Sequence, residues 1–411
     1  MAIDSSELLA LDVVQRLQRA GHVAYWAGGC VRDRLMGRPP KDFDVATSAR
    51  PEEVLKIYPR GQMVGVAFGV VLVREGGGNK RQVEIATFRA DGAYSDGRHP
   101  DSVRFTNAEE DAKRRDFTCN GLFLDPVTEE LHDFVGGRKD IEAKVLRAVG
   151  DARERFAEDH LRMLRAVRFA ARLGFAIDEE TRAAMVALQR KIELISRERI
   201  GEEVRMMLEH PARVAAVELL ASFPEMFAEV FGIAVNATAA ERDWPVVAGL
   251  PERVGRAVAL MALLRAMEVA ELAEASGTLR NRLMLSNEET EELLWLAGKW
   301  PALEEWEDLS KAAMKRMMAD GRWSDLEALY RADPANAEQL LAFGERVTTL
   351  QEEGVAPPPM VTGDVLIRMG ASPGPTFKRW LDELYDRQLE GEFAAKEEAI
   401  TAAKKLVGDS R

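Results

Sequence analysis

The sequence lacks the features of secreted and membrane proteins. Two cysteines, Cys30 and Cys119, are too few for a disulfide framework and favour a reducing compartment such as the cytoplasm. No apolar run reaches the length of about 18 residues that suggests a membrane-spanning helix. The first residues carry Asp4 and Glu7 and no basic segment, so no signal peptide is expected.

Acidic residues outnumber basic residues in the sequence. The net charge is −13, from 69 acidic and 56 basic residues. Taken alone, this balance argues against a nucleic-acid partner, because phosphate contacts need a positive surface. It does not exclude a basic groove on an acidic protein, so the positions of the arginines decide the question.

The 411 residues are 46% hydrophobic and 30% charged, which is ordinary for a globular protein. Helix and strand signals alternate up to about residue 150. The expected elements are a helix over 5–20, strands over 23–27 and 41–46, a short helix over 51–58, a strand over 64–73, a turn over 76–79 and a returning strand over 82–88.

From about residue 156 onward the apolar residues recur at helical spacing and strand-like alternation disappears. Pro357-Pro358-Pro359 marks a break before the last segment. The predicted class is therefore α+β, with an N-terminal head built on a mixed sheet and an elongated all-helical remainder.

Two glycines followed by a basic residue form the strongest local pattern. Gly28 and Gly29 come directly after a predicted strand, and Arg32 lies in the predicted helical turn over 31–36. Glycines let the backbone approach a ligand closely, and a helix N-terminus favours phosphate. The alternative is an ordinary turn with no ligand.

Acidic residues follow on two of the predicted strands. Asp42 and Asp44 are two apart, so on a strand their carboxylates project from one face. Such a pair repels unless a cation lies between them, and Mg²⁺ bound to a triphosphate is the natural cation. Glu84 would join them if its strand lies beside that of Asp42. The alternative is a set of exposed acids at strand ends.

Two arginine-rich segments complete the pattern. In one, Arg115 suits phosphate, while Asp116 and Asn120 suit ribose hydroxyls. The other follows Glu158 and Asp159, and spacings of three and four place its arginines along one side of a helix. These arginines are Arg162, Arg165, Arg168 and Arg172. Asp159 and Arg162 could hydrogen-bond the edge of a base. Solvated charged faces are the alternative for both segments.

Four motifs resemble one family when they are taken in chain order. They are Gly28-Gly29-x-Val31-Arg32-Asp33, Asp42-x-Asp44, Arg114-Arg115-Asp116-Phe117-Thr118-x-Asn120 and Glu158-Asp159-x-x-Arg162. Together they resemble the bacterial-type (class II) tRNA nucleotidyltransferase and poly(A) polymerase family. The segment 197–203 is similar to the part that closes the neck of these enzymes.

The resemblance implies a role for each site residue. Asp42 and Asp44 would bind catalytic Mg²⁺, and Glu84 would assist deprotonation of the RNA 3′-hydroxyl. Asp159 and Arg162 would act as a protein template for cytosine or adenine. The nucleotide-binding set would be Gly28, Gly29, Arg32, Arg115, Asp116, Asn120, Glu158, Asp159, Arg162, Arg165 and Arg168.

The resemblance also implies an activity and partners. The enzyme would add CCA to tRNA lacking its 3′ CCA, using CTP and ATP, with neither DNA nor membrane involved. Gly65 is followed by Val66-Ala67-Phe68-Gly69, as in CCA-adding enzymes, whereas poly(A) polymerases typically carry basic residues there. Addition of CC only or A only and poly(A) polymerase activity remain alternatives, with a non-catalytic RNA-binding protein as a distant rival.

The loop over 90–100 is expected to gate the site or merely to connect strands. Four parts are predicted: a catalytic head over 1–150, a neck with the base-recognition helix over 151–215, a helical body over 216–355 and a helical tail over 356–411. The tail either contacts tRNA near Lys378 and Arg379 or forms a plain helical hairpin.

Overall fold

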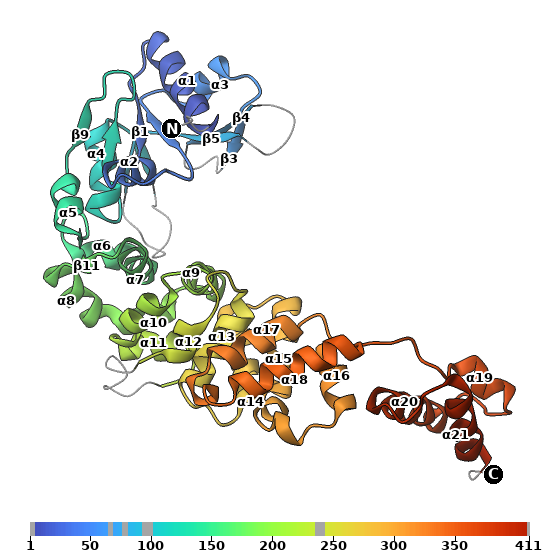
Figure 1. Ribbon diagram of the computed structural model, residues 1–411. Helices are drawn as coiled ribbons and strands as arrows, with labels where there is room; N and C mark the ends of the chain where they lie inside the picture. Colours follow the sequence, from blue (N-terminus) through green and yellow to red (C-terminus); the bar gives the residue numbers. More distant parts are fainter. Residues whose placement is uncertain (1–4, 65–68, 76–80, 93–101, 235–242, 409–411) are drawn as a thin grey trace. The chain divides into compact units, whose positions relative to one another are not determined.

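A computed structural model describes residues 5–64, 69–75, 81–92, 102–234 and 243–408 (Figure 1). The chain forms two compact units. The first comprises Met1–Met207 and Ala215–Arg242, and the second comprises Leu208–Val214 and Asp243–Arg411. The division into head, neck, body and tail at the predicted boundaries stays a prediction.

A seven-stranded sheet with the order β3-β4-β5-β2-β1-β8-β9 forms the centre of the head. The β2–β5 pair is parallel and the other pairs are antiparallel, so the predicted mixed sheet is confirmed. The strands are β1 (Ala24–Ala27), β2 (Asp44–Thr47), β3 (Gln62–Val64), β4 (Val70–Arg74), β5 (Gln82–Thr87), β8 (Leu122–Leu124) and β9 (Leu131–Asp133).

The predicted hairpin between β4 and β5 is confirmed, with Leu72 opposite Glu84. Its glycine turn over 76–79 lies outside the described residues. Residues 65–68, which hold most of the Gly65 motif, and 93–101, which hold most of the predicted gating loop, also lie outside them. The single strand predicted over 64–73 is wrong. The structure has two antiparallel strands there, β3 and β4, with Val64 opposite Val70.

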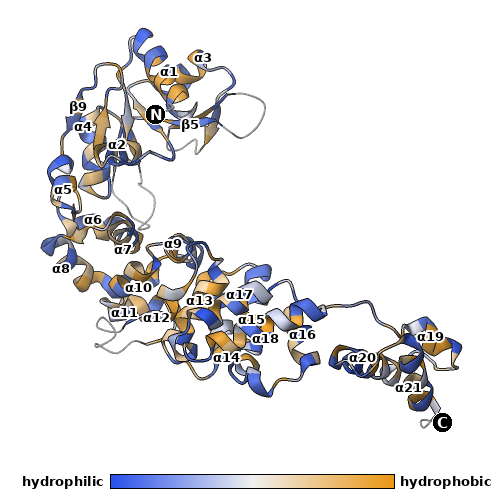
Figure 2. Cartoon of the chain, viewed as in Figure 1, coloured by the Kyte–Doolittle hydropathy of each residue, from blue (hydrophilic) through white to orange (hydrophobic). Residues whose placement is uncertain are grey.

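The predicted first helix is confirmed as α1 (Ser5–Arg19), and the chain turns at Gly21, where φ is +88°. Its apolar side buries Val13 and Leu17 against the sheet, and Figure 2 shows this helix with an orange and a blue side. The other helices of the first unit are α2 (Gly29–Leu35), α3 (Pro51–Ile57), α4 (Ala108–Lys113), α5 (Gly137–Ala143), α6 (Ala152–Glu158), α7 (Leu161–Leu173), α8 (Glu179–Leu188), α9 (Arg197–Leu208), α10 (Arg213–Ala221) and α11 (Pro224–Phe231).

Helices make up most of the chain beyond residue 156, as predicted. In the described residues of this part, the strand β11 (Ala176–Ile177) is an exception, and it pairs in parallel with β10 (Val145–Leu146). The helices of the second unit are α12 (Pro245–Gly249), α13 (Arg256–Ala266), α14 (Leu272–Leu283), α15 (Asn287–Glu304), α16 (Lys311–Met318), α17 (Trp323–Ala332), α18 (Leu340–Glu353), α19 (Gly363–Arg368), α20 (Pro375–Glu390) and α21 (Lys396–Gly408).

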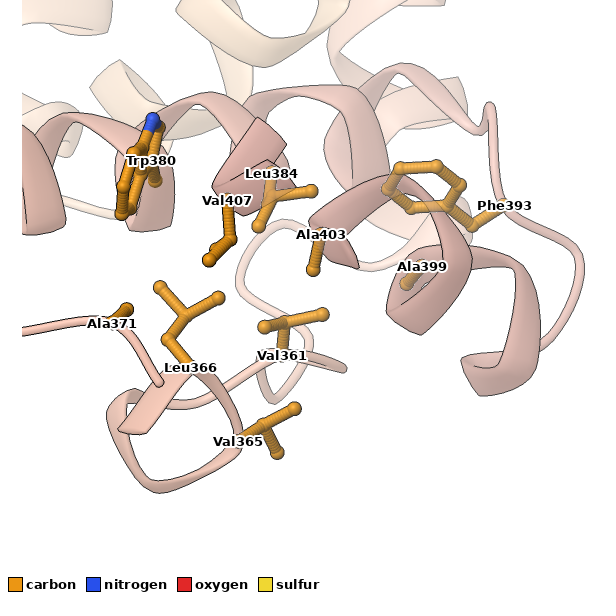
Figure 3. Packing of buried hydrophobic residues seen from close by; sticks show 10 residues of the cluster. All are labelled: Val361, Val365, Leu366, Ala371, Trp380, Leu384, Phe393, Ala399, Ala403 and Val407. Atoms are coloured by element: carbon orange, nitrogen blue, oxygen red, sulfur yellow. The ribbon is translucent and has the colours of Figure 1, made fainter. Parts of the chain in front are cut away.

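The last three helices share a small hydrophobic core (Figure 3). Leu366 of α19, Leu384 of α20 and Ala403 of α21 are almost completely buried in it. Pro375 opens α20, directly after the N-cap residue Gly374. Among the described residues, no helix is both long and apolar enough to span a bilayer.

Candidate active site

The glycine turn joins β1 to α2. Gly28 has a φ of +72°, and its N–H donates to the Leu122 carbonyl at 3.0 Å. A Cβ atom at this position would lie 2.8 Å from Nη1 of Arg115, closer than packed atoms approach. The backbone conformation therefore requires glycine at position 28, and a side chain there would also displace the guanidinium of Arg115.

The two predicted phosphate-binding arginines are held by protein groups around this turn. Arg32 Nη1 donates to Asn120 Oδ1 at 2.6 Å, and its Nη2 pairs with Asp33 at 2.7 Å. Arg115 pairs with Asp111 at 3.1 Å and donates to the Asn120 carbonyl at 3.0 Å. Both guanidinium groups are thus oriented before any ligand binds.

Acidic residues lie at the edge of the same site. Asp44 begins β2 and is the register partner of Glu84 on the parallel strand β5. Neighbouring positions on parallel strands face the same side of a sheet, so the two side chains project together. Desolvation, together with repulsion from Glu84 and Asp42, raises the pKa of Asp44 to about 6, although Arg115 opposes the shift.

Asp42 does not lie on a strand, and this corrects the predicted strand over 41–46. β1 pairs with β2 up to Ala27 opposite Asp44, and the next residue, Gly28, turns away. Residues before Asp44 therefore have no β1 partner. Asp42 is exposed ahead of β2 and still contributes to the repulsion on Asp44.

The base-recognition pair predicted from the sequence lies where α6 meets α7, with Asp159 after α6 and Arg162 in the first turn of α7. Glu158 ends α6, and its Oε2 accepts a short hydrogen bond from Arg162 Nη1. Asp159 is held by Arg199 of α9, whose two terminal nitrogens donate to its oxygens at 3.1 and 2.6 Å. Each member of the predicted pair is thus oriented by a residue of opposite charge.

Two arginines of the α7 row are paired with acids from two other segments. Arg165 donates to Asp116 at 2.6 Å, and Arg168 donates to Glu203 of α9 at 2.6 Å. Burial disfavours the charge of Asp116, but Arg165 outweighs it and keeps the pKa of that carboxyl low. Asn120 Nδ2 also donates to Asp116, at 3.3 Å.

Phe169 was not predicted, yet it contacts three of the predicted arginines. The guanidinium carbons of Arg32, Arg165 and Arg168 lie 5.7, 5.3 and 4.3 Å from the centre of its ring. Such contacts with an aromatic ring are attractive for cations. The signal available in the sequence was an aromatic residue within a row of arginines.

These groups surround one cavity of about 470 Å³. Ten predicted residues and two that were not predicted, Arg114 and Phe169, line it. The predicted residues are Gly28, Gly29, Arg32, Asp44, Arg115, Asp116, Asn120, Asp159, Arg162 and Arg165. Glu84 and Asp42 adjoin Asp44, Glu158 lies behind Arg162, and Arg168 is buried against Glu203.

The acidic residues suit a metal ion that takes some of its ligands from the protein and the others from a bound substrate. Within the described part of the chain, no three His, Cys, Asp or Glu side chains form a cage for an ion. A hard cation that binds one or two carboxylates and takes its other ligands from phosphates needs no such cage. Desolvation and repulsion from Glu84 and Asp42 raise the pKa of Asp44, and Arg115 offsets this shift only in part.

Comparisons with known proteins show which family the chain resembles. The family model for the poly(A) polymerase head domain matches residues 24–147. The model described as the probable RNA and SrmB-binding site of polymerase A matches residues 174–224. A CCA-adding enzyme of Geobacillus kaustophilus is 35% identical over 410 residues, covering 96% of this chain and 95% of that protein.

Solved structures extend the likeness to the whole chain. The crystal structure of the Bacillus stearothermophilus CCA-adding enzyme with CTP has a TM-score of 0.79 and 31% identity, covering 100% of this chain and 98% of that one. The Thermotoga maritima CCA-adding enzyme complexed with tRNA, at 21% identity and a TM-score of 0.71, shares the fold and covers 100% and 97% of the two chains. Because a relative is 35% identical along nearly its full length, the chain belongs to the bacterial-type tRNA nucleotidyltransferase and poly(A) polymerase family.

Proposed function

We propose that this protein adds CCA to the 3′ end of tRNA from CTP and ATP, without a nucleic-acid template. The cavity of about 470 Å³ carries the proposal, because arginines suited to a triphosphate and a pair suited to a base line the same space. Relatives named CCA-adding enzymes, one of them solved with CTP, favour this substrate choice.

Different residues of the cavity contact different parts of the nucleotide. Arg32 and Arg115 hold the triphosphate beside the Gly28 turn, and Asp116 with Asn120 contacts the ribose. Arg32 and Arg115 also stabilise the charge that develops on the leaving pyrophosphate. Because these groups already hold each other by hydrogen bonds, little reorganisation is needed when a nucleotide binds.

Asp42 and Asp44 would hold Mg²⁺, and Glu84 lies where it can accept the proton of the RNA 3′-hydroxyl. When bound, the metal supplies charge neutralisation for an in-line attack on the α-phosphate, with pyrophosphate as the leaving group. Asp44 must be ionised for this role, and a cation beside it would favour the ionised form, which desolvation and the neighbouring acids disfavour.

Base selection falls to Asp159 and Arg162. A carboxylate accepts hydrogen bonds and a guanidinium donates them, so the pair can match the edges of cytosine and adenine. Arg165 and Arg168 stabilise the wall behind this pair through Asp116 and Glu203. We assign catalysis to residues 1–150, base selection to 151–215, a supporting role to the body over 216–355 and tRNA contact to 356–411. We expect the protein to act in the cytoplasm.

A primer-extension gel tests the proposal. Radiolabelled tRNA lacking CCA is incubated with Mg²⁺ and CTP alone, ATP alone or both. Product three nucleotides longer only with both substrates supports CCA addition. A long ladder with ATP alone indicates a poly(A) polymerase, and arrest after two nucleotides with CTP indicates a CC-adding enzyme. No extension with any mixture favours an RNA-binding protein without activity.

A further inference from the structure

Arg155 connects the two halves of the candidate site without lining its cavity. The residue lies in the last turn of α6, and its side chain is 15% exposed. Its Nη2 donates to the Lys113 carbonyl at 2.7 Å, and its Nε donates to the Val149 carbonyl at 3.2 Å. Its Nη1 donates to Glu158 at 2.9 Å.

The first of these contacts lies on the triphosphate side of the site. Lys113 ends α4, so its carbonyl lacks a partner from the helical ladder. The next residues along the chain are Arg114, whose carbonyl is 3.4 Å from Nη1 of Arg155, and then Arg115 and Asp116. Arg155 therefore holds the backbone from which the predicted phosphate and ribose contacts extend.

The other contact lies on the base-selecting side. Oε2 of Glu158 accepts hydrogen bonds from both Arg155 and Arg162. The main-chain carbonyl of Arg155 also accepts from Arg162 Nη1 at 2.8 Å. Arg162 is thus connected to Arg155 twice, once through Glu158 and once directly.

We propose that Arg155 is a positioning residue for base selection, setting Arg162 relative to the triphosphate-binding Arg115. This inference rests on the proposed function, since it deepens the account of the same site. A guanidinium suits the task because its donors form a rigid fork that reaches several acceptors at once. A lysine keeps the charge but offers a single nitrogen, so it cannot reach Lys113 and Glu158 in the same way.

The test compares Arg155→Lys with a matched control, Arg153→Lys, on an exposed position of the same helix. Affinities of the full-length proteins for CTP and UTP are measured by calorimetry, and incorporation of each into tRNA lacking CCA is measured on gels. We expect Arg155→Lys to lower the preference for CTP on the order of tenfold, the effect of losing one hydrogen bond to a charged group. Arg153→Lys should leave the preference unchanged.

A second arm separates positioning from simple helix capping. Glu158→Gln should weaken the CTP preference by itself, and adding Arg155→Lys to it should change the preference little further. An unchanged preference in Arg155→Lys, with only a lower melting temperature, overturns the proposal. Full additivity of the effects of the two substitutions on the CTP preference also overturns the proposal. If Arg155→Lys does not fold, an unaltered preference in Glu158→Gln overturns it as well. If wild type extends no tRNA, the proposed function fails while the calorimetric ratio still tests Arg155.

Discussion

Asp44 and Glu84 are register partners on the parallel strands β2 and β5, and their charges repel. We expect a bound cation to offset this repulsion, so Asp44→Asn should lower activity by several orders of magnitude. Binding of tRNA should persist, because the substitution leaves every basic residue in place. Extension rates and a filter-binding assay measure the two effects. Activity close to that of wild type would refute the metal assignment.

The raised pKa of Asp44, caused by desolvation and by repulsion from Glu84, predicts how stability depends on pH. The pKa of Asp44 is raised from 3.8 to about 6, so its ionised form destabilises the metal-free fold. This penalty is absent below about pH 4, grows between pH 4 and 6, and is complete above pH 6. Asp44→Asn should therefore melt at a higher temperature than wild type at pH 7.5 without metal, with no such gain near pH 4.

Glu84→Gln provides the control for this experiment. Removing the Glu84 charge lowers the pKa of Asp44, so some of the same stabilisation should appear. Equal melting temperatures for wild type and Asp44→Asn at pH 7.5 would contradict the raised pKa.

Arg162→Ala should damage base choice more than triphosphate binding. Arg162 lines the cavity beside Asp159, while the predicted triphosphate contacts come from Arg32 and Arg115. Incorporation of all four nucleotides measures the preference for CTP and ATP over UTP and GTP. A preference equal to that of wild type would exclude Arg162 from the template.

Gly28→Ala should weaken nucleotide binding and stability together, whereas Gly29→Ala should be tolerated by the fold. A Cβ on Gly28 meets Arg115 at 2.8 Å, and the backbone there, with φ +72° and ψ −123°, is strained for any residue other than glycine. A Cβ on Gly29 meets only Arg32 Nη2, at an ordinary 3.6 Å. Thermal melts and CTP titration distinguish the pair, and similar melting temperatures would contradict the steric argument.

Phe169→Leu should make the side chains of the arginines around its ring less well ordered. The substitution keeps an apolar side chain but removes the attraction to Arg32, Arg165 and Arg168, a loss of roughly 1–2 kcal/mol. Urea unfolding and CTP affinity report the change. Phe169→Tyr retains the ring and serves as the control, so equal behaviour of the two variants would show that the ring has no such role.

Local pattern in the sequence determined the family and much of the head. The first helix, the glycine turn, the β4–β5 hairpin and the arginine row of α7 depend on propensity, turn chemistry and periodicity, which act between near neighbours. The four motifs led to the family that the 35% identical relative confirms. The roles of individual site residues stay predictions.

Only the tertiary structure decided how distant residues meet. Asp42 falls before the strand because β1 turns away at Gly28, and no local pattern around residue 42 contains that information. The pairing of Asp159 with Arg199 spans 40 residues, and Arg155 contacts Lys113 across 42. These contacts depend on how helices and strands pack, because a side chain finds its partner through the three-dimensional fold and not through its neighbours in sequence.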